Sequence, residues 1–157
     1  MERVVTVTGD GAVNPGNYKV LFGTNQNELI EAAGGLKEGC EKVISGGPMM
    51  GFAMYTTDTP ITKTSSSILC MSKDEVSACE PTACINCGRC VDACPSRIIP
   101  SRLADFAERH DEEAFLKFNG LECVECGSCS YVCPAKRQLK QAIGSMRKTA
   151  LANKKKK

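Results

Sequence analysis

Two runs of cysteine with the same spacing constrain this chain more than any other feature. The first run spans residues 84–95 and the second spans residues 123–134, and both read C-x2-C-x2-C-x3-C-P. Eight of the 11 cysteines fall within them. Three thiolates separated by two residues each can reach three corners of one cubane iron–sulfur cluster from a single turn. The spacing therefore predicts a segment that folds around two 4Fe–4S clusters.

The fourth cysteine of each run stands before a proline, where the chain turns away from its own cluster. In two-cluster ferredoxins this cysteine ligates the other cluster, so we expect crossed ligand sets. The first set is Cys84, Cys87, Cys90 and Cys133, and the second is Cys123, Cys126, Cys129 and Cys94. Because crossing makes each cluster a staple between two segments, loss of metal should unfold this region.

Other uses of the cysteines account for fewer of them. Zinc needs four ligands, which leaves the repeated third and fourth cysteines without a role. Cys79-x4-Cys84-x2-Cys87 matches the opening of a plant-type 2Fe–2S site, but that site would not use Cys90 or the second run. The three cysteines outside the runs, Cys40, Cys70 and Cys79, are expected to be small buried apolar residues.

Length and charge limit the class of protein. A chain of 157 residues can form one ordinary domain or two small ones. No apolar run approaches the roughly 18 residues of a membrane span. The formal charge is +2. Eight ligating thiolates (about −8) and two oxidised cubane cores (about +4) would bring the loaded protein to about −2. This balance does not favour a nucleic-acid partner.

The part of the chain before the cysteine runs is patterned as a mixed β-rich fold. Residues 4–8 are all β-branched and predict a strand, and residues 18–22 and 42–45 predict two more. Asn25 and Glu28 form a capping-box pattern that predicts a helix to about Ala33, before the glycines at 34 and 35. Strands that are crossed by one helix predict a β-grasp-like half.

The second half is patterned as helices around the clusters. Between Cys94 and Cys123 lie 28 residues, for which Ser101 is the candidate N-cap of a helix. A further helix is expected after Pro134, and the lysines at 154–157 are expected to form a disordered tail. The predicted fold class is α+β. Its parts are a β-grasp-like domain (1–66), a linker or return strand (67–80), a helical two-cluster ferredoxin domain (81–150) and a basic tail (151–157).

Several segments resemble one family in the same order along the chain. They are VVTVTG (4–9), NPGNYKV (14–20), SGGPMMG (45–51) and the two cluster segments (84–95 and 121–134). These segments are similar to the C subunit of the Rnf electron-transport complex, the ion-translocating ferredoxin–NAD oxidoreductase. The resemblance implies a soluble-ligand-binding β-grasp domain followed by a helical dicluster 4Fe–4S ferredoxin domain.

The resemblance also implies a function. Members of that family relay single electrons within a membrane-associated complex, so the expected partners are its other subunits and a ferredoxin or flavin redox partner. The expected location is peripheral, at the cytoplasmic face of the cell membrane. Family members carry a preceding flavoprotein-like domain, whereas this sequence has no Gly-x-Gly-x-x-Gly loop after a strand. We therefore expect a C-terminal portion without a complete catalytic site, with FMN and NAD(H) binding only in the missing domain.

Three other functions are compatible with the same residues. A cobalamin-reductase-type flavoprotein of bacterial microcompartments has a similar layout. Alternatively, the β-grasp half could bind a small ligand while the clusters only stiffen the chain. A free diffusible ferredoxin is the third alternative, although such proteins rarely need the β-rich half.

Overall fold

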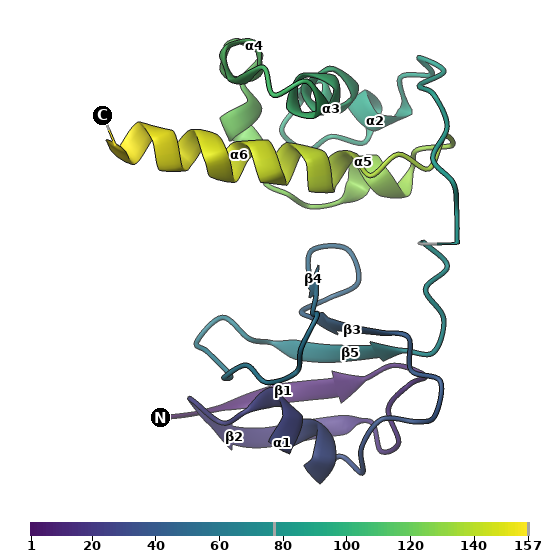
Figure 1. Cartoon of the computed structure of the whole chain (residues 1–157), viewed down its shortest axis with the longest axis vertical. Helices are drawn as coiled ribbons and strands as arrows, with labels where there is room; N and C mark the ends of the chain where they lie inside the picture. The colour runs from purple at the N-terminus through teal and green to yellow at the C-terminus, as the bar shows by residue number, and fades with distance from the viewer. Residues whose placement is uncertain (77, 157) are drawn as a thin grey trace. The chain divides into compact units, whose positions relative to one another are not determined.

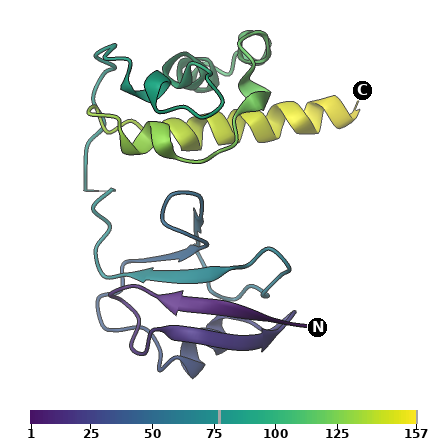
Figure 2. The same ribbon diagram turned by 180° about the vertical axis from the view of Figure 1, so that it is seen from behind.

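A computed structural model describes residues 1–76 and 78–156, the last of these by its backbone alone. The described residues form two compact units, Met1–Ala78 and Cys79–Lys157. The first unit holds the β-sheet, and the second is helical (Figures 1 and 2). The chain is thus a mixed α and β protein, as the residue patterns predict.

The first unit is one five-stranded sheet in the order β2-β1-β5-β3-β4. β1 pairs with β2 in antiparallel fashion and with β5 in parallel, and β3 pairs antiparallel with both β5 and β4. The only helix assigned to the described part of this unit is α1 (Gln26–Ala32). The strands are β1 (Glu2–Thr8), β2 (Gly16–Leu21), β3 (Lys42–Ser45), β4 (Phe52–Ala53) and β5 (Ser67–Met71).

Alternating burial in the two central strands builds the core of this unit. Val5 and Val7 of β1 and Ile68 and Cys70 of β5 are buried, as the two-residue period of a strand requires. They pack with buried residues of α1. The Asn25 side chain accepts a hydrogen bond from the Asn27 amide and so caps α1. The predicted strands and the predicted capped helix are confirmed.

The tight turn after β1 depends on Gly9. Its φ is +108°, and a Cβ at this position would overlap the carbonyl oxygen of Cys70. That oxygen accepts a hydrogen bond from the Gly11 amide. Both the backbone conformation and the close approach therefore require glycine.

We expect Gly9→Ala to destabilise the first unit by about 3 kcal/mol, because it combines backbone strain with a steric clash. The matched control is Gly16→Ala in β2, whose Cβ would meet only the Tyr18 ring, at 3.5 Å. This control should change stability by at most about 1 kcal/mol. Hydrogen exchange of the β1 and β5 amides in urea measures the stability of both variants. Equal losses of stability in the two variants would contradict the requirement for Gly9.

The second unit repeats one local path at its two cysteine runs. Each run contains a short helix, α2 or α5, and is followed by a longer one, α3 or α6. α3 and α6 pack against each other and, with α4, enclose a core that contains Leu103, Phe115 and Ile143. The elements are α2 (Arg89–Asp92), α3 (Pro100–Glu108), α4 (Glu112–Lys117), η1 (Gly120–Glu122), α5 (Ser128–Tyr131) and α6 (Leu139–Lys156).

Two expectations for this unit are wrong. Ser101 does not cap α3, because Pro100 already occupies the first turn and Ile99 is the N-cap residue. Proline is favoured there since its fixed φ suits a first turn that needs no amide donor. The lysines at 154–156 are not a disordered tail but the last turn of α6. The Asn153 amide donates a hydrogen bond of 2.7 Å to Glu112 of α4 and so ties down this end of the helix. Lys157 lies outside the described residues.

Candidate metal centres

The eight cysteines of the two runs line two separate cavities. The cavity that we call the Cys84 cavity is lined by the thiol-bearing residues Cys84, Cys87, Cys90 and Cys133. The other, the Cys123 cavity, is lined by Cys94, Cys123, Cys126 and Cys129. Each cavity thus combines three cysteines of one run with the fourth cysteine of the other. The space between the lining atoms, counted together with the solvent that opens into it, is about 390 Å³ in the Cys84 cavity and about 340 Å³ in the Cys123 cavity.

Left-handed backbone residues bend each run around its cavity. Asn86 and Glu125 occupy the same position in the two runs, with φ of 53° and 55°. Gly88 and Gly127 follow two residues later, also with positive φ, and begin α2 and α5. Residues in this conformation reverse the chain within a few positions. The three clustered cysteines of each run therefore converge on one cavity.

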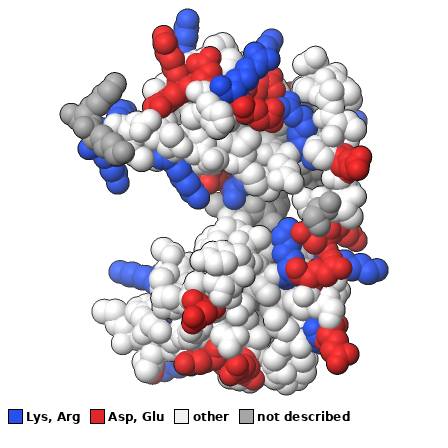
Figure 3. Space-filling model, in the orientation of Figure 1, with Lys and Arg blue, Asp and Glu red and all other residues white. Residues whose placement is uncertain are grey.

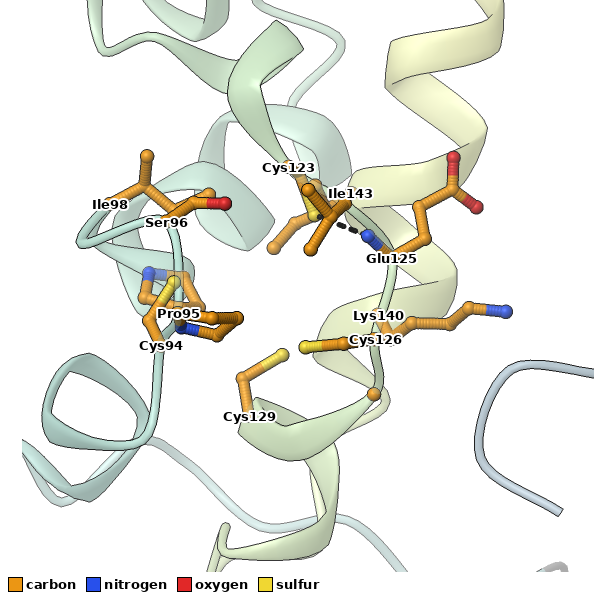
Figure 4. A pocket seen from close by; sticks show the side chains of 13 residues that line it. Cys94, Pro95, Ser96, Ile98, Cys123, Glu125, Cys126, Cys129, Lys140 and Ile143 are labelled. Atoms are coloured by element: carbon orange, nitrogen blue, oxygen red, sulfur yellow. Dashed lines mark hydrogen bonds between the residues drawn. The ribbon is translucent and has the colours of Figure 1, made fainter.

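The Cys123 cavity is shown in Figure 4, where thiols from facing segments point into a common space. Cys94 lies on one side, and Cys126 and Cys129 lie opposite it. The Glu125 amide donates a hydrogen bond to the Cys123 sulfur at 3.4 Å. Amide donors of this kind stabilise negative charge on cluster sulfurs. Buried Ile98 and Ile143 complete the lining with apolar surface.

Two thiols of this cavity, those of Cys123 and Cys129, are poorly suited to remain as unligated thiolates. Burial raises the pKa of Cys129 to about 11. Burial also raises the pKa of Cys123, although the Glu125 amide opposes this. Hydrogen bonding with Ser128 lowers the pKa of Cys126. A cationic metal core stabilises all the thiolates at once.

The donor set and the cavity shape fit an iron–sulfur cluster. In the described part of the chain, no group of three or more His, Cys, Asp or Glu side chains is arranged to hold a metal ion. The thiols surround two cavities and do not meet at one point, as they would around a single ion. A cubane core occupies a volume of its own, which its four ligands must enclose. A four-thiolate shell is the donor set of a 4Fe–4S cluster.

The two cavities differ in their exposure. Cys84 and Cys87 are exposed, whereas Cys90 and Cys133 are half-buried. In the Cys123 cavity, by contrast, Cys129 is only 8% exposed and the other three cysteines are half-buried. A cluster in the Cys84 cavity would therefore lie closer to solvent.

One arginine holds the second cysteine run against α6. Arg147 donates to the carbonyl oxygen of Leu121 at 3.1 Å and to the carboxylate of Glu125 at 3.2 Å. Leu121 and Glu125 flank Cys123, so this arginine fixes the loop that carries the first two cysteines of the run. Both charged side chains are about a quarter to a third exposed, which moderates the strength of the pair.

We expect Arg147→Met to speed the loss of iron from the Cys123 cavity to a chelator by about fivefold, which corresponds to about 1 kcal/mol. The matched control is Lys148→Met, which removes the neighbouring exposed cation. The absorbance of the iron–sulfur chromophore in excess chelator gives both rates. Equal rates in the two variants would show that the Arg147 contacts do not hold the loop.

A second arginine connects the Cys84 cavity to α3. Arg137 lines that cavity, and its guanidinium donates to Asp105 at 2.9 Å and to Glu108 at 2.8 Å. Burial alone would lower the pKa of Arg137, but these two carboxylates raise it, so its charge is permanent. Nothing in the cysteine spacing indicates either arginine, because their partners lie 22 to 32 residues away along the chain.

The three remaining cysteines do not join the cavities. Cys70 is fully buried in the core of the first unit, where burial raises its pKa to about 11, and Cys40 is half-buried. These two fit the expected apolar role. The expectation of burial is wrong for Cys79, which is exposed at the start of the second unit, in the segment 79–88 to which neither helix nor strand is assigned.

Two family models match the chain, one in each unit. A model described as the SLBB domain matches residues 4–53, and a model described as the 4Fe-4S dicluster domain matches residues 83–137. The second match includes all eight cysteines of the two cavities. The helical unit is thus a dicluster ferredoxin domain, and its cysteines are those of an iron–sulfur protein.

Three curated relatives match between 72% and 99% of the chain. The C subunit of the Na(+)-translocating ferredoxin:NAD(+) oxidoreductase complex of Acetobacterium woodii is 40% identical over 155 residues, which are 99% of this chain and 35% of that protein. The proton-translocating counterpart from Clostridium ljungdahlii is 47% identical over 144 residues, 91% of this chain and 32% of the relative. The C subunit of the ion-translocating oxidoreductase complex of Yersinia enterocolitica is 42% identical over 114 residues, 72% of this chain and 16% of that protein. The chain spans about a third of the length of the first two relatives.

Proposed function

The chain belongs to the family of C subunits of ion-translocating ferredoxin–NAD oxidoreductase complexes, and on this basis we propose that it relays single electrons through two 4Fe–4S clusters as part of such a complex. The observation that carries the proposal is the grouping of eight cysteines into two four-cysteine cavities. The clusters would supply the one-electron chemistry.

The protein residues would hold the clusters, cover them and keep them apart. We assign Cys84, Cys87, Cys90 and Cys133 to one cluster and Cys94, Cys123, Cys126 and Cys129 to the other. The lining of each cavity supports these crossed sets. The left-handed turns at Asn86 and Glu125 direct the three clustered cysteines of each run towards one cavity. Ile98 and Ile143 would shield the Cys123 cavity from water.

The first unit is proposed to be a β-grasp module of the soluble-ligand-binding type. The match to the SLBB domain and the mixed sheet packed on α1 support this assignment.

The proposed partners are the other subunits of the complex and a ferredoxin or flavin redox partner. FMN and NAD(H) would bind to the part of the relatives that this chain does not match, since the relatives are about three times longer.

The proposed location is peripheral, at the cytoplasmic face of the cell membrane. Within the described residues, none of the helices combines the length and the apolar character needed to span a bilayer. On the face shown in Figure 3, acidic and basic side chains are interspersed.

The relatives' names do not favour the cobalamin-reductase alternative.

The relay is tested by counting the electrons that the full chain releases. We would reconstitute it anaerobically, reduce it with dithionite, remove the excess reductant and mix it with a one-electron acceptor in a stopped-flow instrument. Two electrons per chain should be released, one from each cluster. Release of one electron or none, with both clusters in place, would contradict the relay.

A further inference from the structure

The two cavities are built by repeated segments, so they can be compared position by position. Cys94 and Cys133 end the two runs, and four residues after them stand Ile98 and Arg137. Ile98 lines the Cys123 cavity, and Arg137 lines the Cys84 cavity. Ile98 is buried, and the Arg137 side chain is only 12% exposed. One cavity thus has a nearly buried cation where the other has a hydrocarbon side chain.

The carboxylates that pair with Arg137 belong to a groove beside the Cys84 cavity. Asp105 and Glu108 line a neighbouring groove that shares Arg137 and Cys84 with the Cys84 cavity, but neither acid lines the cavity itself. Of these three charged residues, Arg137 alone contributes to the lining of the Cys84 cavity, and the two acids hold its guanidinium in place.

The charged residues at the Cys123 cavity are arranged differently. Lys140 and Glu125 contribute to its lining, but Figure 4 shows both charged ends pointing away from the thiols. Glu125 is also paired with Arg147. This cavity therefore has an apolar cover and charged groups that are directed outward.

A cluster becomes more negative when it is reduced. A nearby cation and contact with solvent both stabilise the reduced form and raise the reduction potential. Arg137 and the exposed Cys84 and Cys87 supply both effects at the Cys84 cavity, whereas buried Ile98 and Cys129 supply neither at the Cys123 cavity.

We propose that Arg137 sets a higher reduction potential for the cluster of the Cys84 cavity than for the cluster of the Cys123 cavity, and so makes the exposed cavity the exit of the relay. One electron leaves the reduced cluster of the Cys123 cavity and reduces the oxidised cluster of the Cys84 cavity. From there it passes to an external one-electron redox protein. This inference rests on the proposed function.

The test is a potentiometric titration of the reconstituted full chain, monitored by electron paramagnetic resonance. The signal that changes in Cys84→Ser identifies the cluster of the Cys84 cavity. Arg137→Gln should reduce the ratio of reduced to oxidised cluster in that cavity by up to about tenfold at fixed ambient potential, which equals about 59 mV for one electron. The signal of the Cys123 cavity should not shift.

Glu108→Gln should shift the reduction potential of the same cluster in the opposite direction. It removes one carboxylate from a side chain that is 57% exposed and leaves the Asp105 pair intact, so it should raise the same ratio by a few-fold. Arg109→Gln removes an exposed cation that lines neither cavity and should shift neither signal. A general loosening of the domain would shift the reduction potential in the same direction in Arg137→Gln and in Glu108→Gln. Shifts of opposite sign would therefore be specific to the change in charge.

Four results would overturn the inference: no shift in Arg137→Gln, equal shifts at both clusters, a shift of the same sign in Glu108→Gln, or a wild-type potential that is higher at the Cys123 cavity. Each leaves the electron relay standing, provided that both clusters are present and reducible. A wild-type chain that assembles fewer than two clusters would overturn the relay and this inference together.

Discussion

Cys133→Ser is expected to damage the cluster of the first cysteine run and to spare the cluster of its own run. The Cys133 thiol lines the Cys84 cavity, although the residue belongs to the run at 123–134. Removal of one of four thiolates weakens a cluster, because the remaining three leave one iron without its sulfur ligand. We expect iron content to fall from about eight towards about four atoms per chain.

The reciprocal variant is Cys94→Ser, which should damage only the cluster of the Cys123 cavity. The matched control is Cys79→Ser, which changes an exposed cysteine that lines neither cavity. This variant should keep both clusters. Electron paramagnetic resonance of the reduced variants distinguishes the clusters. If Cys133→Ser removed the signal that Cys126→Ser also removes, the ligand sets would be uncrossed and the assignment wrong.

Removal of iron is expected to unfold the second unit and to leave the first unit folded. Five of the eight proposed ligands belong to the core of the second unit: Cys129 is buried in it, and Cys90, Cys94, Cys123 and Cys133 pack against it. Without the clusters, these thiols would line empty hollows and the staples between the two runs would be lost. The core of the first unit contains none of the ligands, so its stability should not depend on iron.

Hydrogen exchange before and after anaerobic chelation measures this difference. Amides of α3 and α6 should exchange at least roughly a hundredfold faster in the iron-free chain, since their protection then reports a nearly unfolded unit. Amides of β1 and β5 should keep their rates within about twofold. Retained protection in α3 and α6 would mean that apolar packing alone folds the second unit.

Local sequence patterns predicted the elements whose determinants are local. The β-branched residues at 4–8 form β1, and Asn25 caps α1 because its side chain reaches an amide only two residues away. The repeated cysteine spacing predicted where the metal-binding unit lies, because each run forms a tight turn by itself. These features depend on neighbouring residues and need no knowledge of the rest of the fold.

Features that depend on distant partners were missed. Arg137 and Arg147 each make contacts with residues more than 20 positions away, and no pattern in the sequence links them. The extent of α6 was underestimated for the same reason, since Glu112 anchors its last turns through Asn153. Ser101 was favoured as a cap from residue type alone, although the helix begins at Pro100 with Ile99 as its N-cap, two positions earlier than predicted.

The most direct test of the proposed relay is the metal and sulfide content of the full chain after anaerobic reconstitution, with Mössbauer spectroscopy to identify the iron. Two cubane clusters require about eight irons and about eight acid-labile sulfides per chain, with every iron in a tetrahedral sulfur site. This is the result that we predict. Four irons, irons in 2Fe–2S clusters, or stoichiometric zinc in place of iron would contradict a relay through two 4Fe–4S clusters.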